Sequence, residues 1–210
     1  VIKKIASNIT TPLPFIIPYQ KSLRPKWLIK LGLFLYDNIG GKMTIPKSST
    51  INIKKEIPNI LKDQFKIGFQ YYDLQVDDKK LVQLNVEDAK KKGAMIIQNR
   101  KVIDAKRNKN IWDITLDDNT ILQSKILINA AGPWINEVLS NVIKLNSKKL
   151  IRLVKGSHII TKSLYSQKKA FTLQNEDNRI IFVIPYKDKY SLIGTTETEV
   201  FSPENPKIDE

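Results

Sequence analysis

The pattern of hydrophobic and polar positions divides the chain into alternating helical and extended segments. One helix is predicted to begin at Pro25, a residue suited to a first helical turn, and to end before Gly40. With Lys26 and Lys30 beside them, its apolar side chains would suit a membrane surface or a partner as well as a core. These side chains follow the helical period and predict an amphipathic core helix: Trp27, Leu28, Leu31, Leu35 and Ile39.

A second helix is predicted after a strand rich in Phe and Tyr at residues 65–76. Asp77 or Asp78 would cap its N-terminus, and Gly93 would end it. Its inward positions are Leu81, Leu84, Val86 and Ala89. Residues 1–23 contain three prolines, which predict an extended or irregular stretch after a short helical remnant.

Most of the remaining segments are predicted strands. One strand at residues 94–98 follows the second helix, and a short buried strand at 126–128 leads into a turn and a helix ending near Leu139. Between them, turns rich in Asn and Asp separate three strands of an antiparallel meander, at residues 101–106, 112–116 and 121–122. Further strands are predicted at residues 150–161, 170–173, 179–185 and 190–194.

Composition limits the chemistry that the chain can perform by itself. Its 210 residues, 41% of them hydrophobic, can bury the core of one or two domains. The absence of Cys excludes disulfides and thiolate metal sites, and a single His leaves little for zinc, so redox chemistry would need a cofactor. No apolar run approaches the ~18 residues that span a bilayer. Because the chain opens on Val1 without a leader-like pattern, we expect a soluble or peripheral piece of a longer protein.

The net charge of +14 is typical of proteins that bind nucleic acid or anionic membranes. The lysines, however, occur in small groups at predicted helix ends and loops, with no basic stripe interleaved with aromatic residues. The charge therefore favours a solvated surface first, contact with anionic lipid second, and nucleic acid last.

The segment with the most chemistry is the turn NAAGPW at residues 129–134, after the predicted buried strand. Small residues at the end of such a strand let main-chain amides approach a ligand, and the following helix N-terminus favours a pyrophosphate. From spacing alone, the same string also suits a plain tight turn between a strand and a helix.

The order of these elements resembles the glutathione-reductase-like FAD enzymes of the D-amino-acid-oxidase superfamily. Within them, the chain is similar to the aerobic, quinone-linked glycerol-3-phosphate dehydrogenases. The strings that carry this resemblance follow the family's order along nearly the whole chain: LRPKW at 23–27, GLFLYD at 32–37, VDD at 76–78, NAAGPW at 129–134, RLVKGSH at 152–158, QNED at 174–177, RIIFVIPY at 179–186 and IGTT at 193–196.

The resemblance implies a mixed α/β fold with part of an FAD domain, including the meander, and a β-sheet substrate domain. It implies that residues 1–65 form a helical or irregular linking segment, that 66–140 form a partial FAD-binding domain, and that 141–210 form a partial β-rich substrate domain. It also implies a reaction: oxidation of sn-glycerol 3-phosphate to dihydroxyacetone phosphate by hydride transfer to FAD, with electrons passing to a quinone. The implied location is cytoplasmic, or peripheral on the cytoplasmic face of the inner membrane.

Candidate site residues follow from the same resemblance. His158 is the candidate base for the substrate hydroxyl, because imidazole titrates near neutrality; a sole histidine is otherwise often structural. Lys155, Arg179 and Thr196 are candidates for binding the substrate, although the two cations would also suit surface ion pairs. The cofactor candidates are the main chain of Val102, which also suits a plain core position, and the turn residues Ala130, Ala131, Gly132, Pro133 and Trp134.

The chain also departs from the family. Its eight glycines never approach the Gly-x-Gly-x-x-Gly spacing that holds the FAD pyrophosphate, and relatives continue beyond the position of Glu210. We therefore expect N- and C-terminal segments to be needed for completion, and the 210 residues alone to be inactive. A basic module that contacts anionic lipid or nucleic acid without catalysis is the alternative function.

Overall fold

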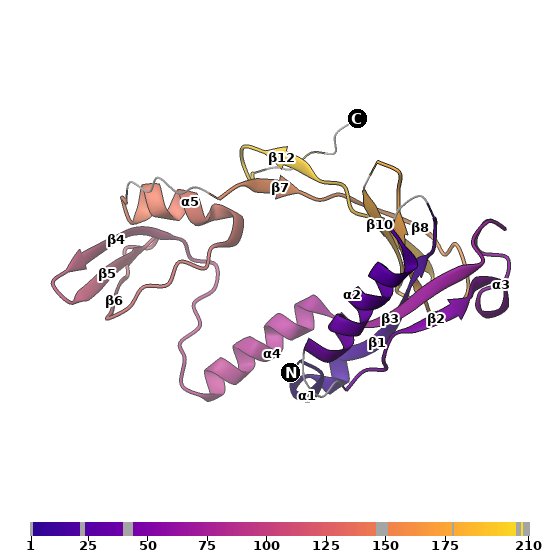
Figure 1. Cartoon of the computed structure of the whole chain (residues 1–210). Coiled ribbons are helices and arrows are strands. Elements are labelled where there is room, and N and C mark those ends of the chain that lie inside the picture. Colours follow the sequence, from indigo (N-terminus) through magenta and orange to yellow (C-terminus); the bar gives the residue numbers. More distant parts are fainter. Residues whose placement is uncertain are drawn as a thin grey trace. The chain divides into compact units, whose positions relative to one another are not determined.

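A computed structural model describes residues 2–21, 24–39, 44–145, 151–177, 179–204 and 207. They form two compact units (Figure 1). Unit 1 comprises Val1–Glu87 and Gly156–Thr196, and unit 2 comprises Asp88–Lys155 and Glu197–Glu210. The predicted mixed α/β class is confirmed.

Unit 1 is built on a seven-stranded sheet with the order β2-β3-β1-β9-β10-β11-β8. Neighbouring strands are antiparallel except β1 and β9, which are parallel. The strands are β1 (Thr10–Pro18), β2 (Ser49–Asn52), β3 (Ile67–Val76), β8 (His158–Lys162), β9 (Ala170–Gln174), β10 (Ile180–Tyr186) and β11 (Tyr190–Gly194). The helices are α1 (Ile2–Ile5), η1 (Ser7–Ile9), α2 (Lys26–Ile39) and α3 (Ile53–Glu56), and α4 (Asp78–Lys91) crosses the boundary to unit 2.

Residues 1–23 take the extended form that was one of the two predicted alternatives, after the short helix α1, but β1 is also a fully paired strand, which was not predicted. β1 pairs with β3 along all nine of its residues. The amide of Tyr19, the next residue, donates to the carbonyl of Ile67 at 2.9 Å, so odd-numbered residues direct their main-chain groups toward β3. The prolines are all even-numbered and lose no hydrogen bond to β3, while β9 covers only two residues of β1. They are Pro12, Pro14 and Pro18.

The sheet of unit 1 buries apolar side chains on both of its faces. On one face, Ile16, Phe171 and Val183 pack with Ile53 and Ile57 from the α3 region. On the other face, a second group packs together: Leu13, Phe15 and Ala170, with Tyr71, Phe182 and Ile184. Alternate residues of β1 thus supply opposite faces, as the two-residue period of a strand requires.

Helix α2 forms where it was predicted, but it is not a core helix. Asp37 is its one buried residue among those described, whereas Trp27 is 65% exposed and Ile39 is 79% exposed. Near its C-terminal end the helix reaches the sheet through Tyr36, whose hydroxyl donates to the carbonyl of Tyr72 at 2.8 Å. The periodicity identified a helix correctly, but in the described chain no surface covers most of its apolar side chains.

Helix α4 matches its sequence pattern closely. Asp77 accepts a hydrogen bond from the amide of Lys80 at 3.0 Å, which is the expected N-terminal cap. Gly93, with φ of +90°, follows the end of the helix as expected. The half-buried positions of the helix are the four predicted inward residues: Leu81, Leu84, Val86 and Ala89.

Unit 2 contains the predicted meander, in which β5 pairs with both β4 and β6. Its core consists of Ala105, Ile114 and Val142. The strands are β4 (Val102–Asn108), β5 (Ile111–Leu116), β6 (Ile121–Ser124), β7 (Leu153–Lys155) and β12 (Thr198–Val200), the last two forming an antiparallel pair. The helical turns after the meander are η2 (Gly132–Trp134), α5 (Ile135–Glu137) and η3 (Val138–Val142), the last a π-helical segment.

Two predicted strands of unit 2 are absent. Residues 94–98 and 126–128 have no strand pairing in the described chain, and Met95 and Ile128 are 79% and 80% exposed. Both segments are apolar, but a strand also needs a neighbour for its main-chain groups, and the described residues supply none.

The division into units also differs from the expected one. Because β3 pairs with β1, residues 67–76 belong to the sheet of unit 1 and not with the meander. In the β-rich C-terminal part, residues 141–155 and 197–210 fall in unit 2. β-pairing between distant segments, which local patterns do not reveal, sets these boundaries.

Candidate functional site

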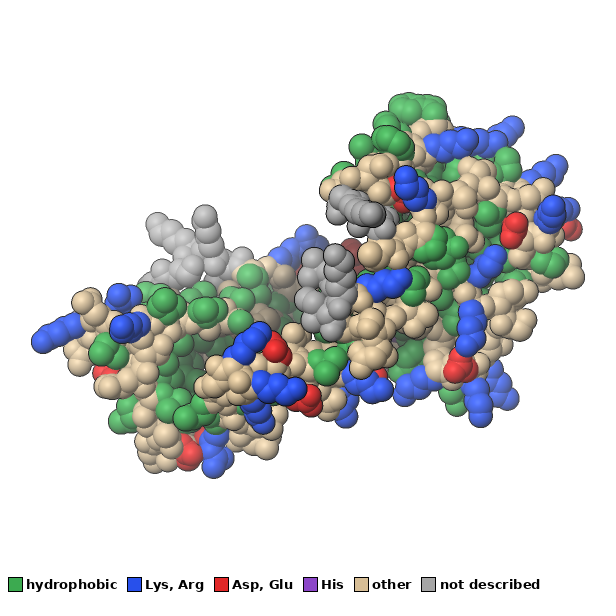
Figure 2. All heavy atoms as spheres, turned by 90° about the horizontal axis from the view of Figure 1, so that it is seen from below, with side chains coloured by type: hydrophobic (Ala, Val, Ile, Leu, Met, Phe, Trp, Pro, Cys, Tyr) green, Lys and Arg blue, Asp and Glu red, His purple; other side chains and the backbone are tan. Residues whose placement is uncertain are grey.

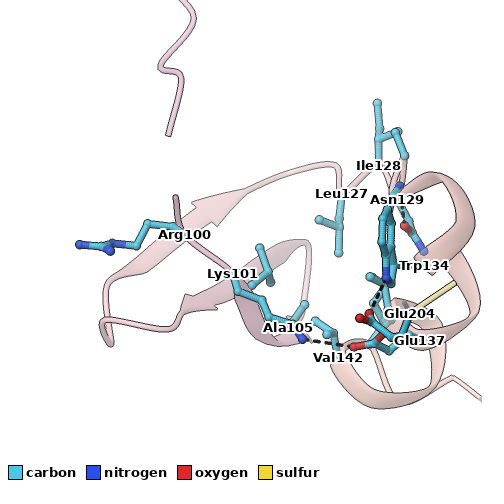
Figure 3. Close-up of a pocket in the computed structure, with 15 residues that line it drawn as sticks. Arg100, Lys101, Ala105, Leu127, Ile128, Asn129, Trp134, Glu137, Val142 and Glu204 are labelled. Carbon is cyan, nitrogen blue, oxygen red and sulfur yellow. Dashed lines mark hydrogen bonds and ion pairs between the residues drawn. The ribbon is translucent and has the colours of Figure 1, made fainter. Parts of the chain in front are cut away.

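A hollow of about 450 Å³ lies in unit 2 (Figure 3). Its walls come from residues 100–102 around the start of β4, from residues 127–131 before η2, and from Trp134 and later residues of the helical turns. The volume falls within the range of ~300–1,000 Å³ typical of small-molecule sites. Four predicted cofactor residues line it: Val102, Ala130, Ala131 and Trp134.

Asn129 shapes the turn that borders this hollow. Its side-chain amide donates to the carbonyl of Ile135 at 3.1 Å, and its side-chain oxygen accepts from the amide of Ala131 at 3.2 Å. These two bonds hold the main chain of the turn between Asn129 and the following helical segment. The sequence analysis gave Asn129 no role, although an Asn ahead of small turn residues is a recognisable signal for this kind of side-chain bond.

Gly132 and Pro133 belong to the same turn but do not line the hollow. Gly132 has φ of +56°, and no atom lies within 4 Å of the position that a Cβ would occupy. The glycine is therefore required by backbone conformation, while the space beside it is open to a ligand.

Two charged contacts lie at the rim of the hollow. Lys101 Nζ is 3.2 Å from Glu137 Oε1, and the indole Nε1 of Trp134 donates to Glu204 Oε1 at 2.9 Å (Figure 3). Val102 both lines the hollow and packs on the Ala105 core, so a core position and a place beside the hollow are compatible at this residue. Glu204 lies outside every sequence motif, and no sequence signal identified it.

In unit 1, His158 is the first residue of the edge strand β8 and is exposed. It lies opposite Gly194 of β11. Close by, the amide of Ser157 donates to Thr196 Oγ1 at 3.2 Å, and the amide of Thr196 donates to the carbonyl of Ser157 at 3.3 Å. The structure therefore brings together two predicted site residues, His158 and Thr196.

The register of the sheet places His158 in a row of facing residues. Thr172 pairs with Phe182, Phe182 with Gly194, and Gly194 with His158. Since directly paired residues point to the same face of a sheet, His158 shares its face with the buried group that contains Phe182 and Tyr71.

A polar pair that the sequence analysis missed lies on that face. The Tyr71 hydroxyl and Thr172 Oγ1 are 3.0 Å apart, and Thr172 is buried. Burial raises the pKa of Tyr71, against the lowering effect of the Thr172 hydrogen bond, and the Asp73 carboxylate adds to the increase. Tyr71 is thus a neutral hydroxyl group at neutral pH.

The two predicted cations have partners of their own, and within unit 1 Arg179 does not lie beside His158. Arg179 precedes β10 and binds Asp177 at 2.6 Å through both Nε and Nη2. Since Phe182, not Arg179, lies in the row of His158, Arg179 is offset by about 10 Å along the strand and by two strand spacings of ~4.8 Å. Lys155 belongs to unit 2, where its Nζ donates to the carbonyl of Lys207 at 2.5 Å.

Comparison with known protein families settles the lineage. The model of the FAD dependent oxidoreductase family matches residues 32–210. The chain belongs to this family. The family resemblance inferred from the sequence motifs is confirmed. FAD, the cofactor that the resemblance implied, is the cofactor of this family.

Within this family, the chain is similar to curated dehydrogenases whose names specify phosphorylated polyols. The chain is 40% identical to a glycerol-3-phosphate dehydrogenase of Pseudomonas aeruginosa over 92% of its own length, and 38% identical to the aerobic glycerol-3-phosphate dehydrogenase of Escherichia coli over 100%. It is also 39% identical to the D-erythritol 1-phosphate dehydrogenase of Brucella abortus over 94%. The chain spans about 40% of the length of these relatives, at 38%, 43% and 40% respectively.

Solved structures agree on the fold. The glycerol-3-phosphate dehydrogenase of Bacillus halodurans, complexed with FAD, matches 99% of the chain with a TM-score of 0.74 at 22% identity, and the chain covers 38% of it. Glycine oxidase from Geobacillus kaustophilus matches with a TM-score of 0.70 at 14% identity, the match covering 99% of this chain and 54% of the oxidase.

The hollow of unit 2 fits part of a dinucleotide cofactor such as FAD. Its wall at Ala130 and Ala131 has small side chains, which let main-chain atoms approach a ligand closely, and the next residue of the turn, Gly132, has open space beside it outside the lining of the hollow. The sequence has no Gly-x-Gly-x-x-Gly loop, so the described residues provide only some of the contacts that such a cofactor needs.

Proposed function

We propose that this chain is part of a flavoenzyme that oxidises sn-glycerol 3-phosphate to dihydroxyacetone phosphate. The observation that carries the proposal is the identity of about 40% to glycerol-3-phosphate dehydrogenases over nearly the whole chain. A D-erythritol 1-phosphate dehydrogenase is equally similar. The shared substrate class is therefore a phosphorylated polyol, and glycerol 3-phosphate is the member that most of these relatives' names support.

We assign cofactor binding to the hollow of unit 2. The main chain of Val102 and the turn residues 130–134 would hold FAD, and Asn129 would fix the shape of that turn. When bound, FAD supplies the acceptor for the hydride removed from the substrate.

We assign proton transfer to His158 in unit 1. A ring nitrogen of His158 would take the proton of the C2 hydroxyl as the C2 hydride leaves, so that the alcohol becomes a ketone. The exposed position of His158 and its polar neighbour Thr196 support this role. Thr196 would then donate a hydrogen bond to the substrate. Arg179 and Lys155 stay candidates for the phosphate, but their present contacts with Asp177 and Lys207 give them no special support.

We further propose that electrons pass to a quinone and that the enzyme works at the cytoplasmic face of the inner membrane. Helix α2 supports a membrane contact, because Trp27, Phe34 and Ile39 are exposed next to Lys26 and Lys30. No described helix is long and apolar enough to cross a membrane. Co-sedimentation with vesicles of anionic and of neutral lipid would test this contact; equal binding of α2-substituted and unchanged chains would contradict it.

The activity is tested by dye reduction with glycerol 3-phosphate or D-erythritol 1-phosphate, and with FAD. We expect no turnover by the 210 residues alone, and turnover once segments that supply a glycine-rich FAD loop and the remainder of the relatives' length are joined to them. His158→Ala should abolish turnover of the completed enzyme, whereas Lys162→Ala, on the same edge strand, should leave it intact. Full activity of His158→Ala would remove the proposed role of His158.

Cofactor binding is tested with a matched pair of glycines. Gly132 and Gly93 both have positive φ and both have open space at the Cβ position, but only Gly132 belongs to the turn at the hollow. In the completed enzyme we expect Gly132→Leu to lower the flavin content and Gly93→Leu to leave it unchanged. An equal flavin content in both variants would contradict the assignment.

The alternative of a basic binding module rests on the charge alone. On the face shown in Figure 2, Lys and Arg side chains are scattered among other surface groups and form no continuous stripe. Salt-sensitive binding to DNA of random sequence, with no flavin uptake in the completed enzyme, would favour that module over a flavoenzyme.

A further inference from the structure

The imidazole of His158 lies against a residue that has no side chain. His158 of β8 and Gly194 of β11 are directly paired, and Gly194 is buried. A Cβ placed on Gly194 would lie 2.5 Å from His158 Cδ2 and 2.9 Å from His158 Cγ. These separations are far below van der Waals contact, so the ring occupies the space that any other residue at position 194 would fill.

We propose that Gly194 is a positioning residue that sets the orientation of the His158 imidazole. The catalytic meaning of this inference rests on the proposed role of His158, whereas the positioning itself does not. Gly194 touches neither substrate nor cofactor in the proposal; it acts through the histidine ring.

The main chain around this pair is held on both sides. Ser157 and Thr196 exchange two hydrogen bonds just beyond it, and on the other side Ile159 pairs with Ile193. A Cβ on Gly194 would also lie 2.9 Å from the carbonyl oxygen of Ser157. That second conflict is with the backbone, and the hydrogen bonds on both sides restrict how far the backbone can shift, so the ring also has to move if the glycine is replaced.

A second glycine at the same strand ends provides a comparison. A Cβ on Gly156 would lie 2.6 Å from Thr195 Oγ1, the far end of a short side chain, and 3.4 Å from the carbonyl oxygen of Thr196. Rotation of the Thr195 hydroxyl would relieve most of this conflict, at the loss of its 3.0 Å bond to the carbonyl of Thr196. Gly156→Ala should therefore disturb Thr195 and leave the His158 ring in place.

The composition of the chain makes the test direct, because His158 is its only histidine. The imidazole protons therefore give a single set of NMR signals in the 210-residue chain. In the unchanged chain we expect a nuclear Overhauser effect between the Gly194 Hα protons and His158 Hδ2. Its absence would overturn the proposal before any substitution is made.

Three glycine substitutions then distinguish a specific effect on the His158 ring from the effect of any glycine-to-alanine change. We expect Gly194→Ala to shift the His158 imidazole signals, and Gly156→Ala to shift them little. Gly32→Ala should shift them not at all, since no atom lies within 4 Å of the Cβ position of Gly32. Unchanged imidazole signals in Gly194→Ala, or equal shifts in all three variants, would overturn the proposal.

A double-mutant cycle covers the case in which Gly194→Ala is too unstable for NMR. If the alanine methyl conflicts with the His158 ring, Gly194→Ala should cost less stability in a His158→Ala background than in the unchanged chain. An equal cost in both backgrounds would count against the proposal.

Activity of the completed enzyme then links this inference to the proposed function. With His158 as the base, Gly194→Ala should lower kcat by about a hundredfold with little change in KM, as expected for a misplaced reacting group. If the imidazole signals shift but kcat does not change, Gly194 still positions His158 and the proposed role of His158 as the base fails. If the signals do not shift, the positioning fails whatever the activity.

Discussion

Apolar extended segments are paired and buried in the sheet of unit 1, but two such segments of unit 2 are unpaired and exposed in the described chain. In unit 1, Ile16 of β1 and Phe171 of β9 pair with each other and are 0% and 2% exposed. In unit 2, residues 94–98 and 126–128 are comparably apolar, yet they pair with no strand in the described chain, and Ile128 is 80% exposed. The same hydrophobic pattern yields a strand only where a neighbour supplies hydrogen bonds and a surface to pack on.

The two units therefore differ in how much of their structure is complete within the described residues. The sheet of unit 1 has seven mutually paired strands and apolar packing on both faces. Unit 2 has a three-stranded meander and a small core, while residues 126–128, which lead into the wall of the hollow, pair with no strand in the described chain. We infer that the hollow of unit 2 depends on further structure much more than the His158 region of unit 1 does.

Hydrogen exchange should show the largest difference. In the 210-residue chain, we expect the amides of Met95 and Ile128 to exchange about a thousandfold or more faster than that of Phe171, because only the last belongs to a paired, buried strand. NMR or mass spectrometry measures these rates. In the completed enzyme, the exchange at Met95 and Ile128 should slow strongly; unchanged fast exchange there would contradict the idea that these segments await strand partners.

Core truncation should give the next largest effect. Ile16→Ala removes a fully buried side chain and should destabilise unit 1 by about 2–5 kcal/mol. The matched change Ile128→Ala, at an exposed position, should alter stability by less than about 0.5 kcal/mol. Urea unfolding of both variants checks the pair, and a similar loss in each would mean that residues 126–128 are packed in solution.

The sequence identified those elements whose signals are local. The cap at Asp77, the end at Gly93 and the four half-buried positions of α4 follow from one helix's own residues, as do the turns of the meander. It predicted an extended or irregular stretch at residues 1–23 but did not identify β1 as a paired strand, because the prolines lie where the strand needs no N–H group for its pairing with β3. It also placed α2 in a core, since periodicity reports an apolar face but not what covers it.

For the candidate site too, the sequence identified the residues that belong to local motifs and missed those that depend on strand pairing. The turn at 129–134 and the pair of His158 and Thr196 were identified from motifs, and the structure places each at a defined position. Tyr71, Thr172 and Gly194 were missed, because their relation to His158 depends on the register of β8, β9, β10 and β11 and, for Tyr71, on a contact with a strand about 100 residues away in the sequence. No local pattern carries that register.

Tyr165 provides a smaller and pH-dependent test of unit 1. Its hydroxyl donates to the carbonyl of Val183 at 3.1 Å, and its ring packs on Phe171 with centroids 5.0 Å apart. Tyr165→Phe should cost about 1 kcal/mol near neutral pH, because the ring stays and one hydrogen bond is lost.

The direction of the pH effect follows from burial, which raises the pKa of Tyr165. A raised pKa in the folded state means that the stabilisation is fully present below the ordinary value of about 10 and is lost as the pH rises through the higher folded value. Unfolding at pH 8 and pH 11 should therefore show a smaller difference between the unchanged chain and Tyr165→Phe at the higher pH. A constant difference would contradict the assigned cause.

The smallest effect is expected at Asp104, which links β4 to the helical turns of unit 2 through exposed charges. Its carboxylate lies 2.7 Å from Lys144 Nζ and 3.3 Å from Lys106 Nζ. The Lys144 hydrogen bond is the main cause that lowers the pKa of Asp104, with a smaller contribution from Lys106. A lowered pKa in the folded state stabilises above the ordinary value of about 4 and is lost as the pH falls through the folded value. Asp104→Asn should therefore destabilise the meander slightly at neutral pH, less so below pH 4 and less so in high salt, because exposed ion pairs are screened.

Exchange of the buried Ala105 amide measures this local stability, with Asp113→Asn as the control, since Asp113 is bonded to the neutral Gln123. A salt-independent loss larger than that of Tyr165→Phe would show that the charges of unit 2 contribute as much as the buried contacts of unit 1, which would break the contrast between the two units.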